Sequence, residues 1–270
     1  MRSYYITSPV TTMLNATLGG LIKDYRIKKR LLQSDLSRRI GWRDTSRLSK
    51  IEQGRVGRPT RITIDKIINA LGLSEQEKGE FLLVGGYLPS ASEIKKITKT
   101  VEERIMTWQY PAFLIDFSWR CLLINYPTAK VFCFPKDLVL KIPELKPNLL
   151  EFVIAPKEIM PVSLYKGDDR ASMKPFIIAQ IAQFKIEHMG RENDSWYKAL
   201  ISKLAKNDVF LKYWNEVTIQ DYHKKLLDYE YKEVELSGKK TKKNKFHVFT
   251  SRLILDQRFQ VILYLPADKV

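Results

Sequence analysis

The chain has few of the residues that most metal sites and many active sites need. Its 270 residues include two cysteines, Cys121 and Cys133, and three histidines, His188, His223 and His247. The cysteines lack a C-x-x-C arrangement, which argues against a disulfide framework or a zinc site and is typical of a reducing compartment. The histidines lack the spacing of metal ligands, and no glycine-rich phosphate loop or nucleophile elbow occurs. We therefore expect no metal, no cofactor and no enzymatic activity.

Long hydrophobic runs are also missing. No apolar stretch approaches the roughly 18–20 residues that a membrane span requires, and the first residues lack the apolar core of a signal peptide. The expected protein is cytoplasmic, without integral membrane association. Its length suits two domains, and 44% hydrophobic and 28% charged residues are enough for a buried core and a soluble surface.

Acidic residues are in short supply relative to basic ones. The chain has 30 Asp and Glu against 46 Lys and Arg, so its net charge is +16. Between Leu21 and Lys66 alone there are fourteen basic and five acidic residues, a net charge of +9. A compact basic segment attracts polyanions, which makes nucleic acid and acidic membranes the candidate partners.

Helical periodicity predicts five helices before residue 88. Leu36 and Ile40 face inward from the second helix, Leu48 and Ile51 from the third, and Ile64, Ile67, Ile68 and Leu71 from the fourth. The sequence Ser-Glu-Gln-Glu at 74–77 is a capping box that opens the fifth. A connecting helix is expected over 92–109, with Ile94, Ile97, Val101, Ile105 and Met106 on one side.

The stretch from residue 32 to 54 predicts two short helices joined by a tight turn. Leu48 and Ile51 lie three residues apart and must point into the core, so the opposite face of that helix is polar. A polar helix face of this kind can enter the major groove of DNA, although any single residue on it could simply be solvated. The outward residues are Ser46, Ser49, Lys50 and Gln53, with Thr45 at the N-terminal edge, Asp44 as the N-cap and Gly54 as the C′ residue.

This pattern resembles the helix-turn-helix of the phage-repressor, or XRE-type, family. The resemblance implies that Gln33, which opens the second helix, bonds a backbone phosphate and that Arg26 pairs with Glu52. It also implies that the basic loop after the third helix clamps phosphates. The turn at 41–44 is one residue longer than usual in the family. The predicted DNA contacts are Gln33, Arg43, Thr45, Ser46, Ser49, Lys50, Arg55, Arg58 and Arg61.

The remainder of the chain predicts strands at 112–117 and 119–125, helices at 176–189, 196–205 and 209–216, and strands at 229–236, 245–256 and 258–266. Together with residues 82–89, 110–112, 210–214 and 264–266, this layout resembles the MmyB-like transcriptional regulators. The fold class is then α+β with two domains: an all-α, five-helix helix-turn-helix domain and a PAS-like antiparallel sheet with helices. The boundaries are 1–88, a connecting helix at 89–109, and 110–270. The lysine-rich run at 239–245 departs from the family pattern and is most simply a solvated hairpin tip.

The resemblance implies that the PAS-like domain binds a small apolar molecule, with fatty acids a plausible class. Phe113, Ile115 and Phe117 would share one strand face, and Trp119, Cys121, Leu123 and Asn125 another. Aromatic residues of inner strands are more often plain core, and Asn125 could instead cap the helix that starts near residue 126. The candidate ligand contacts are Phe113, Trp119, Leu123, Asn125 and Trp214.

These features predict a sequence-specific transcription regulator that binds double-stranded DNA as a homodimer and senses a small molecule. One alternative is a DNA-binding regulator whose second domain binds only protein, without a ligand. Another is a non-specific nucleic-acid or membrane-surface binder that uses the same positive charge.

Overall fold

The computed structural model describes residues 17–132, 134–154, 174–218, 234–236 and 244–266. Two compact units divide the chain. The helical unit comprises the residues up to Leu88 together with 254–258, and the sheet unit comprises the remainder. The predicted boundaries had assigned 254–258 to the C-terminal domain. Cys133, His223 and the lysines at 239–243 fall outside the described residues.

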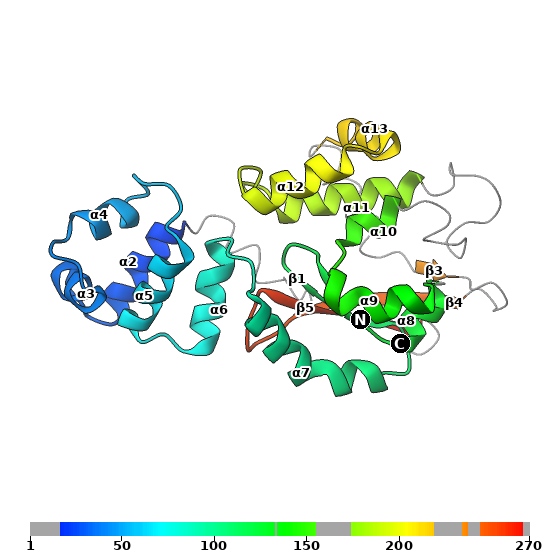
Figure 1. Ribbon diagram of the computed structural model, residues 1–270, viewed down its shortest axis with the longest axis horizontal. Helices are drawn as coiled ribbons and strands as arrows, with labels where there is room; N and C mark the ends of the chain where they lie inside the picture. Colours follow the sequence, from blue (N-terminus) through cyan, green and yellow to red (C-terminus); the bar gives the residue numbers. More distant parts are fainter. Residues whose placement is uncertain (1–16, 133, 155–173, 219–233, 237–243, 267–270) are drawn as a thin grey trace, which may run out of the picture. The chain divides into compact units, whose positions relative to one another are not determined.

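Five helices form the helical unit within its described part (Figure 1): α2 (Leu18–Lys28), α3 (Gln33–Ile40), α4 (Ser46–Glu52), α5 (Arg61–Leu71) and α6 (Glu75–Val84). Their inward faces meet in one apolar core that includes the predicted leucines and isoleucines of α3, α4 and α5. Hydroxyl side chains of Thr17, Thr60 and Ser74 accept backbone N–H groups at the starts of α2, α5 and α6. Gly41 and Gly72 end α3 and α5 with φ of 85° and 61°, a backbone conformation that favours glycine.

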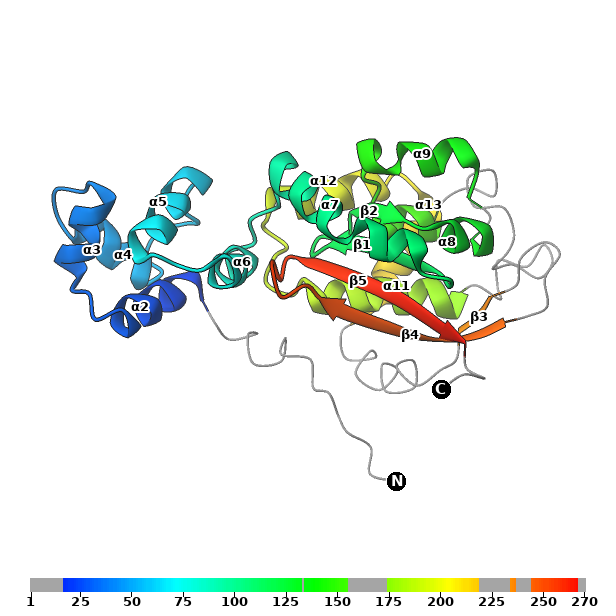
Figure 2. The ribbon, with the colours of Figure 1, turned by 90° about the horizontal axis from the view of Figure 1, so that it is seen from below.

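The sheet unit is built on one antiparallel sheet in the order β2-β1-β5-β4-β3 (Figure 2). Its strands are β1 (Ala112–Asp116), β2 (Cys121–Ile124), β3 (Val234–Leu236), β4 (Asn244–Arg252) and β5 (Phe259–Pro266). The α+β fold with two domains is therefore confirmed. The fourth strand was predicted to end four residues too late, because the chain leaves β5 after Arg252 and the following residues form a turn.

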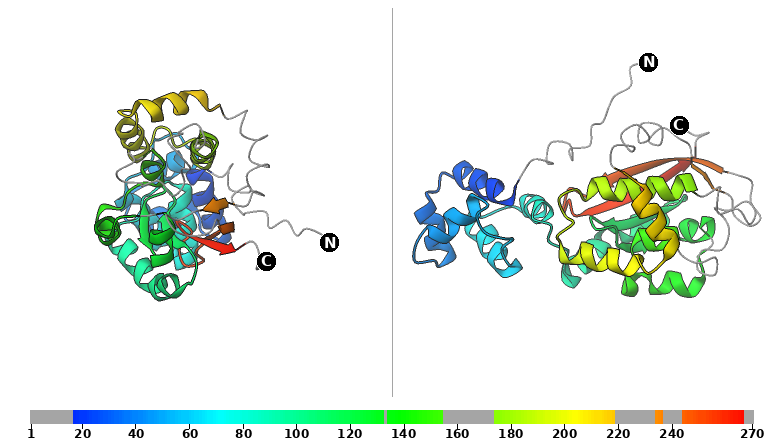
Figure 3. Two further views of the ribbon diagram at one scale, coloured as in Figure 1. Left: turned by 90° about the vertical axis from the view of Figure 1, so that its right-hand side faces the viewer. Right: turned by 90° about the horizontal axis from the view of Figure 1, so that it is seen from above.

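Helices cover both faces of this sheet (Figure 3). On one face lies α7 (Ala91–Thr107), which buries Ile94, Ile97 and Ile105. Met106, predicted on the same side of α7, is instead 49% exposed. The helices that contribute to the cluster on the other face are α8 (Tyr126–Val131), α9 (Lys136–Leu145), α10 (Leu149–Ile154), α11 (Lys174–Glu187), α12 (Ser195–Leu204) and α13 (Asp208–Glu216).

An irregularity in the β1–β2 pairing changes which residues face which layer. Leu114 pairs with Leu123, but Ile115 pairs with Cys121, so Leu122 is an extra residue in β2. An extra residue reverses the alternation of side chains along a strand. Cys121 consequently packs into the cluster with Ile115, whereas Leu123 packs on the α7 side. The expectation that Cys121 and Leu123 share a face is wrong for this reason.

Candidate nucleic-acid interface

Helix α4 presents the polar face that the sequence predicts. Leu48 and Ile51 are buried in the core of the helical unit, while Ser46, Lys50 and Gln53 are exposed. Ser49 is half-buried, and its hydroxyl accepts a hydrogen bond from the Gln53 amide at 3.0 Å. The outward residues therefore form a short polar strip along one side of α4.

The start of α4 differs by one residue from the predicted capping. Thr45, not Asp44, occupies the N-cap position, and its side chain makes no capping hydrogen bond. The carboxylate of Asp44 does this instead, accepting the backbone N–H of Ser46 at 2.8 Å. That hydrogen bond, together with one to the Ser46 hydroxyl, lowers the pKa of Asp44. Gly54, with φ of 66°, takes the predicted C′ position after α4.

The five-residue turn between α3 and α4 is organised by an aromatic residue. Trp42 is half-buried against the core, and the guanidinium of Arg47 lies 4.8 Å from the centre of its ring. Arg47 also donates to the Thr63 hydroxyl at 3.4 Å. Arg47 is exposed on α4 and is not among the DNA contacts predicted from the sequence. Arg43, in the same turn, is exposed.

A buried polar network ties α2, α3 and α4 together. The Arg26 guanidinium donates to both carboxylate oxygens of Glu52, at 2.7 and 3.0 Å, as the family resemblance implied. A further nitrogen of Arg26 donates to the carbonyl of Leu31 at 2.8 Å. The side-chain amide of Gln33 donates to Glu52 at 2.8 Å. Because that amide has a second hydrogen, Glu52 can orient Gln33 while leaving it a donor for an anion.

Helix α2 packs closely on the C-terminal end of α4, and a small residue makes this possible. A Cβ atom on Gly19 would overlap the carbonyl oxygens of Ile51 and Glu52. The absence of a side chain at residue 19 therefore lets the two backbones approach at the position where Glu52 receives Arg26.

A tyrosine anchors the basic loop from Arg55 to Thr60. Tyr87 donates its hydroxyl to the carbonyl of Pro59 at 2.6 Å, and burial raises its pKa to about 12. Arg58 lies 5.7 Å from the centre of the same ring. Arg55 is exposed. Arg61, at the start of α5, is held by Asp65 through two contacts of 3.0 and 3.1 Å, so a phosphate would share it with a carboxylate.

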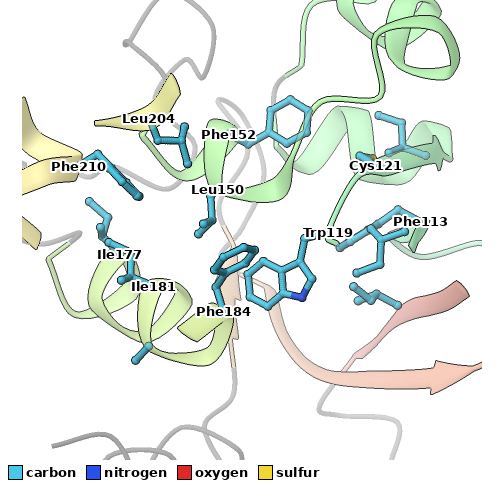
Figure 4. Close-up of a cluster of buried hydrophobic side chains, with 14 of the residues drawn as sticks. Phe113, Trp119, Cys121, Leu150, Phe152, Ile177, Ile181, Phe184, Leu204 and Phe210 are labelled. Carbon is cyan, nitrogen blue, oxygen red and sulfur yellow. The ribbon is translucent and has the colours of Figure 1, made fainter. Parts of the chain in front are cut away.

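The predicted ligand contacts of the sheet unit separate into two groups. Phe113, Trp119 and Trp214 belong to the same apolar cluster, in which Trp119 packs edge-on against Phe184 (Figure 4). The indole nitrogen of Trp119 donates to Glu187 at 2.9 Å. Leu123 lies on the opposite face of the sheet and is wrong as a member of this group.

The side chain of Asn125 makes its hydrogen bonds inside the protein, and the helix-capping alternative for this residue is confirmed. It is 0% exposed and caps α8, its oxygen accepting the N–H groups of Thr128 and Ala112, both at 3.0 Å. Its amide nitrogen donates to the carbonyls of Trp108 and Tyr110 at 3.0 and 2.7 Å. These bonds join the end of α7, the first residue of β1 and the start of α8.

Substituting Asn125 tests this structural role. We expect Asn125→Ala to reduce the free energy of unfolding of the sheet unit by about 2–3 kcal/mol, because a helix cap is lost and buried backbone groups are left unpaired. Urea denaturation followed by circular dichroism measures the change. Asn193→Ala, an exposed asparagine in the loop before α12, is the matched control and should change it by less than about 0.5 kcal/mol. Equal stability of the two variants would contradict the role.

Comparison with protein families gives one finding: a model described as a helix-turn-helix domain matches residues 17–81. Those residues are α2 to α6 up to Phe81, including the whole surface described above. The chain thus contains a helix-turn-helix domain, the kind of domain by which transcription regulators bind DNA. A search of curated proteins found no match.

Among the described residues, no helix is long and apolar enough to cross a membrane, and no group of three or more His, Cys, Asp or Glu side chains could hold a metal ion.

Proposed function

We propose that this protein is a sequence-specific transcription regulator that places α4 in the major groove of double-stranded DNA. One observation carries the proposal: α4 exposes a polar strip while Glu52, at its buried end, is clamped by Arg26 and orients Gln33. A recognition helix must be rigid before it binds, because ordering it on the DNA would reduce the affinity. The site of action would be the cytoplasm, where the DNA of a prokaryotic cell lies.

The exposed side chains divide into two roles under this proposal. Thr45, Ser46, Ser49 and Lys50 would contact base edges, since hydroxyls bond either kind of edge and lysine reaches guanine acceptors. Asp44 holds the Ser46 backbone and thereby fixes where the strip begins. The residues that we assign to phosphates are Gln33, Arg43, Arg55, Arg58 and Arg61, and we add Arg47 because it is an exposed cation on α4.

The proposal is tested by selecting the preferred duplex from a random pool and then comparing two lysine variants on it. Lys50→Ala should weaken binding to the selected site by about 1–3 kcal/mol, roughly 5- to 150-fold, and relax the preference at one base pair. Lys23→Ala removes an exposed lysine from α2 and serves as the control, with the preference unchanged. If no discrete site is selected, and the affinity is the same for duplexes of different sequence, the proposal is contradicted and a non-specific binder is favoured.

For the sheet unit we propose a sensor role, the division of labour that the resemblance to MmyB-like regulators implies. The support is the wall of aromatic residues around Trp119 and Phe113, which would suit a small apolar molecule such as a fatty acid. Asn125 and Leu123 are no longer part of that proposal. Native mass spectrometry of the purified chain tests it, with a retained lipid expected.

The alternative for the sheet unit is an interaction module without a ligand. It is favoured by the number of polar groups already satisfied inside the protein: the Asn125 amide, the Trp119 indole and the Asp116 carboxylate, which binds Ser118 and Arg120. A chain that carries no bound molecule in native mass spectrometry, and that no added fatty acid stabilises, would support this alternative.

A further inference from the structure

Helix α4 has a fixed hydrogen-bond donor beside each of its two flanks. The helical period of about 100° per residue places Arg47 and Glu52 on opposite flanks, each about 70° from the middle of the buried face. On one flank, Glu52 faces α3 and orients the side-chain amide of Gln33. On the other flank, Arg47 faces α5 and the turn before α4, where its guanidinium contacts Trp42 and Thr63.

Arg47 is exposed, yet its guanidinium is fixed at two points. It lies over the Trp42 ring, and one of its nitrogens donates to the Thr63 hydroxyl at 3.4 Å. The attraction to the ring uses none of the five N–H donors of the guanidinium, so most of them remain for an anion. No described carboxylate forms an ion pair with Arg47, in contrast to Arg61, which Asp65 holds.

Trp42 is itself anchored through its backbone and its side chain. Its backbone N–H donates to the carbonyl of Ser37 at 2.8 Å, and that of Gly41 donates to Arg38 at 3.0 Å, the two bonds of a Schellman motif that ends α3. The half-buried ring packs against the core of the helical unit. An arginine side chain ordered by such a ring loses less conformational entropy when it binds an anion.

We propose that Trp42 is a positioning residue, which holds Arg47 against a phosphate of the DNA strand opposite to the one that Gln33 contacts. The major groove is about 12 Å wide, and an α-helix with its side chains is about 10–12 Å across. Each flank of a helix in that groove therefore faces one of the two phosphate backbones. This inference rests on the proposed function, because it requires α4 to enter the major groove.

Two fixed donors on opposite flanks set how α4 is rotated between the strands. Phosphate contacts position a protein on the duplex, whereas contacts with base edges determine the preferred sequence. Trp42 thereby influences which base edges Ser46 and Lys50 meet, although its own ring is covered by Arg47. The lengthened turn, which supplies Trp42, is then part of how this domain reads its site.

The contact between Trp42 and Arg47 is tested first on the full chain without DNA, by nuclear magnetic resonance. The ring current of the indole should displace the side-chain resonances of Arg47. Trp42→Leu should abolish this displacement, and Trp42→Phe should retain part of it. Arg47 resonances that are the same in the wild type and in Trp42→Leu would overturn the positioning role, whether or not the protein binds DNA.

The strand assignment is tested on the selected duplex, in which single phosphates are replaced by uncharged methylphosphonates. In the wild type, one replacement on each strand of a half-site should weaken binding at least about tenfold, as loss of a charged hydrogen bond does. Arg47→Ala should abolish the effect on one strand only, and Gln33→Ala the effect on the other. Arg104→Ala, an exposed arginine on α7, is the control and should leave both effects unchanged.

Trp42→Leu should reduce the methylphosphonate effect on the Arg47 strand by at least about half, and Trp42→Phe should restore most of it. Circular dichroism checks that the variants are folded, and Arg47→Ala, which removes an exposed side chain, tests the strand assignment even if Trp42→Leu is unstable. If Arg47→Ala and Gln33→Ala act on the same strand, or if folded Trp42→Leu behaves as the wild type, this inference alone is overturned. A wild type that selects no site refutes the proposed function as well.

Discussion

Replacing Glu52 with alanine is expected to lower the free energy of unfolding of the helical unit by about 3–5 kcal/mol. Glu52 has a side chain only 2% exposed and receives both Arg26 and Gln33. Without it, the Arg26 guanidinium stays buried with no counter-charge, and this uncompensated charge causes most of the loss. In a domain of this size, each 1 kcal/mol shifts the melting temperature by about 4–8 °C.

The measurement is thermal and urea denaturation of the wild type and the variant, with Asp65→Ala as control. Asp65 also pairs with an arginine, but that pair is partly exposed to solvent, so its loss should change the free energy by less than about 1 kcal/mol. The double variant Arg26→Met/Glu52→Met should recover much of the stability lost in Glu52→Ala, since it removes both charges together. Glu52→Ala should change the free energy of unfolding more than it changes the preference of the protein for particular base pairs. An unchanged melting temperature for Glu52→Ala would contradict this account.

The predictions that succeeded depended on local patterns. Leu48 and Ile51 define the buried side of α4 by their spacing alone, and Ser74 with Glu77 forms the capping box that the sequence predicts. The pairing of Arg26 with Glu52 was available from the family resemblance, because both residues belong to its motif. Each of these features requires information from one helix or one motif.

The predictions that failed depended on contacts between distant segments. The extra residue at Leu122 is fixed by how β2 pairs with β1, and no alternation within β2 reveals it. The fit of Arg47 over Trp42 depends on how the lengthened turn folds back on α4. The cap that Asn125 forms on α8 was predicted from the sequence, but the bonds of its amide to two carbonyls that precede β1 were not, because only the folded chain brings those carbonyls near.

The second prediction with a large effect concerns how the affinity for DNA depends on salt concentration. The described basic side chains of the interface lie at the surface, so on binding they would displace the counterions condensed on the DNA phosphates. If a bound dimer neutralises roughly six to eight phosphates, the logarithm of the affinity should fall against the logarithm of salt with a slope near −5 to −7. Raising the salt from about 50 to about 200 mM should then weaken binding by about 10³- to 10⁴-fold. Fluorescence anisotropy on the selected duplex measures it.

Single substitutions show which residues contribute to the salt dependence of the affinity. Arg55→Ala removes one exposed cation per subunit, so the slope for a dimer should become shallower by about 2, with the base preference unchanged. Ser46→Ala should do the reverse, changing the base preference while leaving the slope unaltered, because a hydroxyl displaces no counterion. Arg61→Ala should have a smaller effect than Arg55→Ala, since Asp65 already neutralises much of that guanidinium. A slope that stays flat in the wild type would rule out phosphate contacts by this loop, whatever the sequence preference of α4.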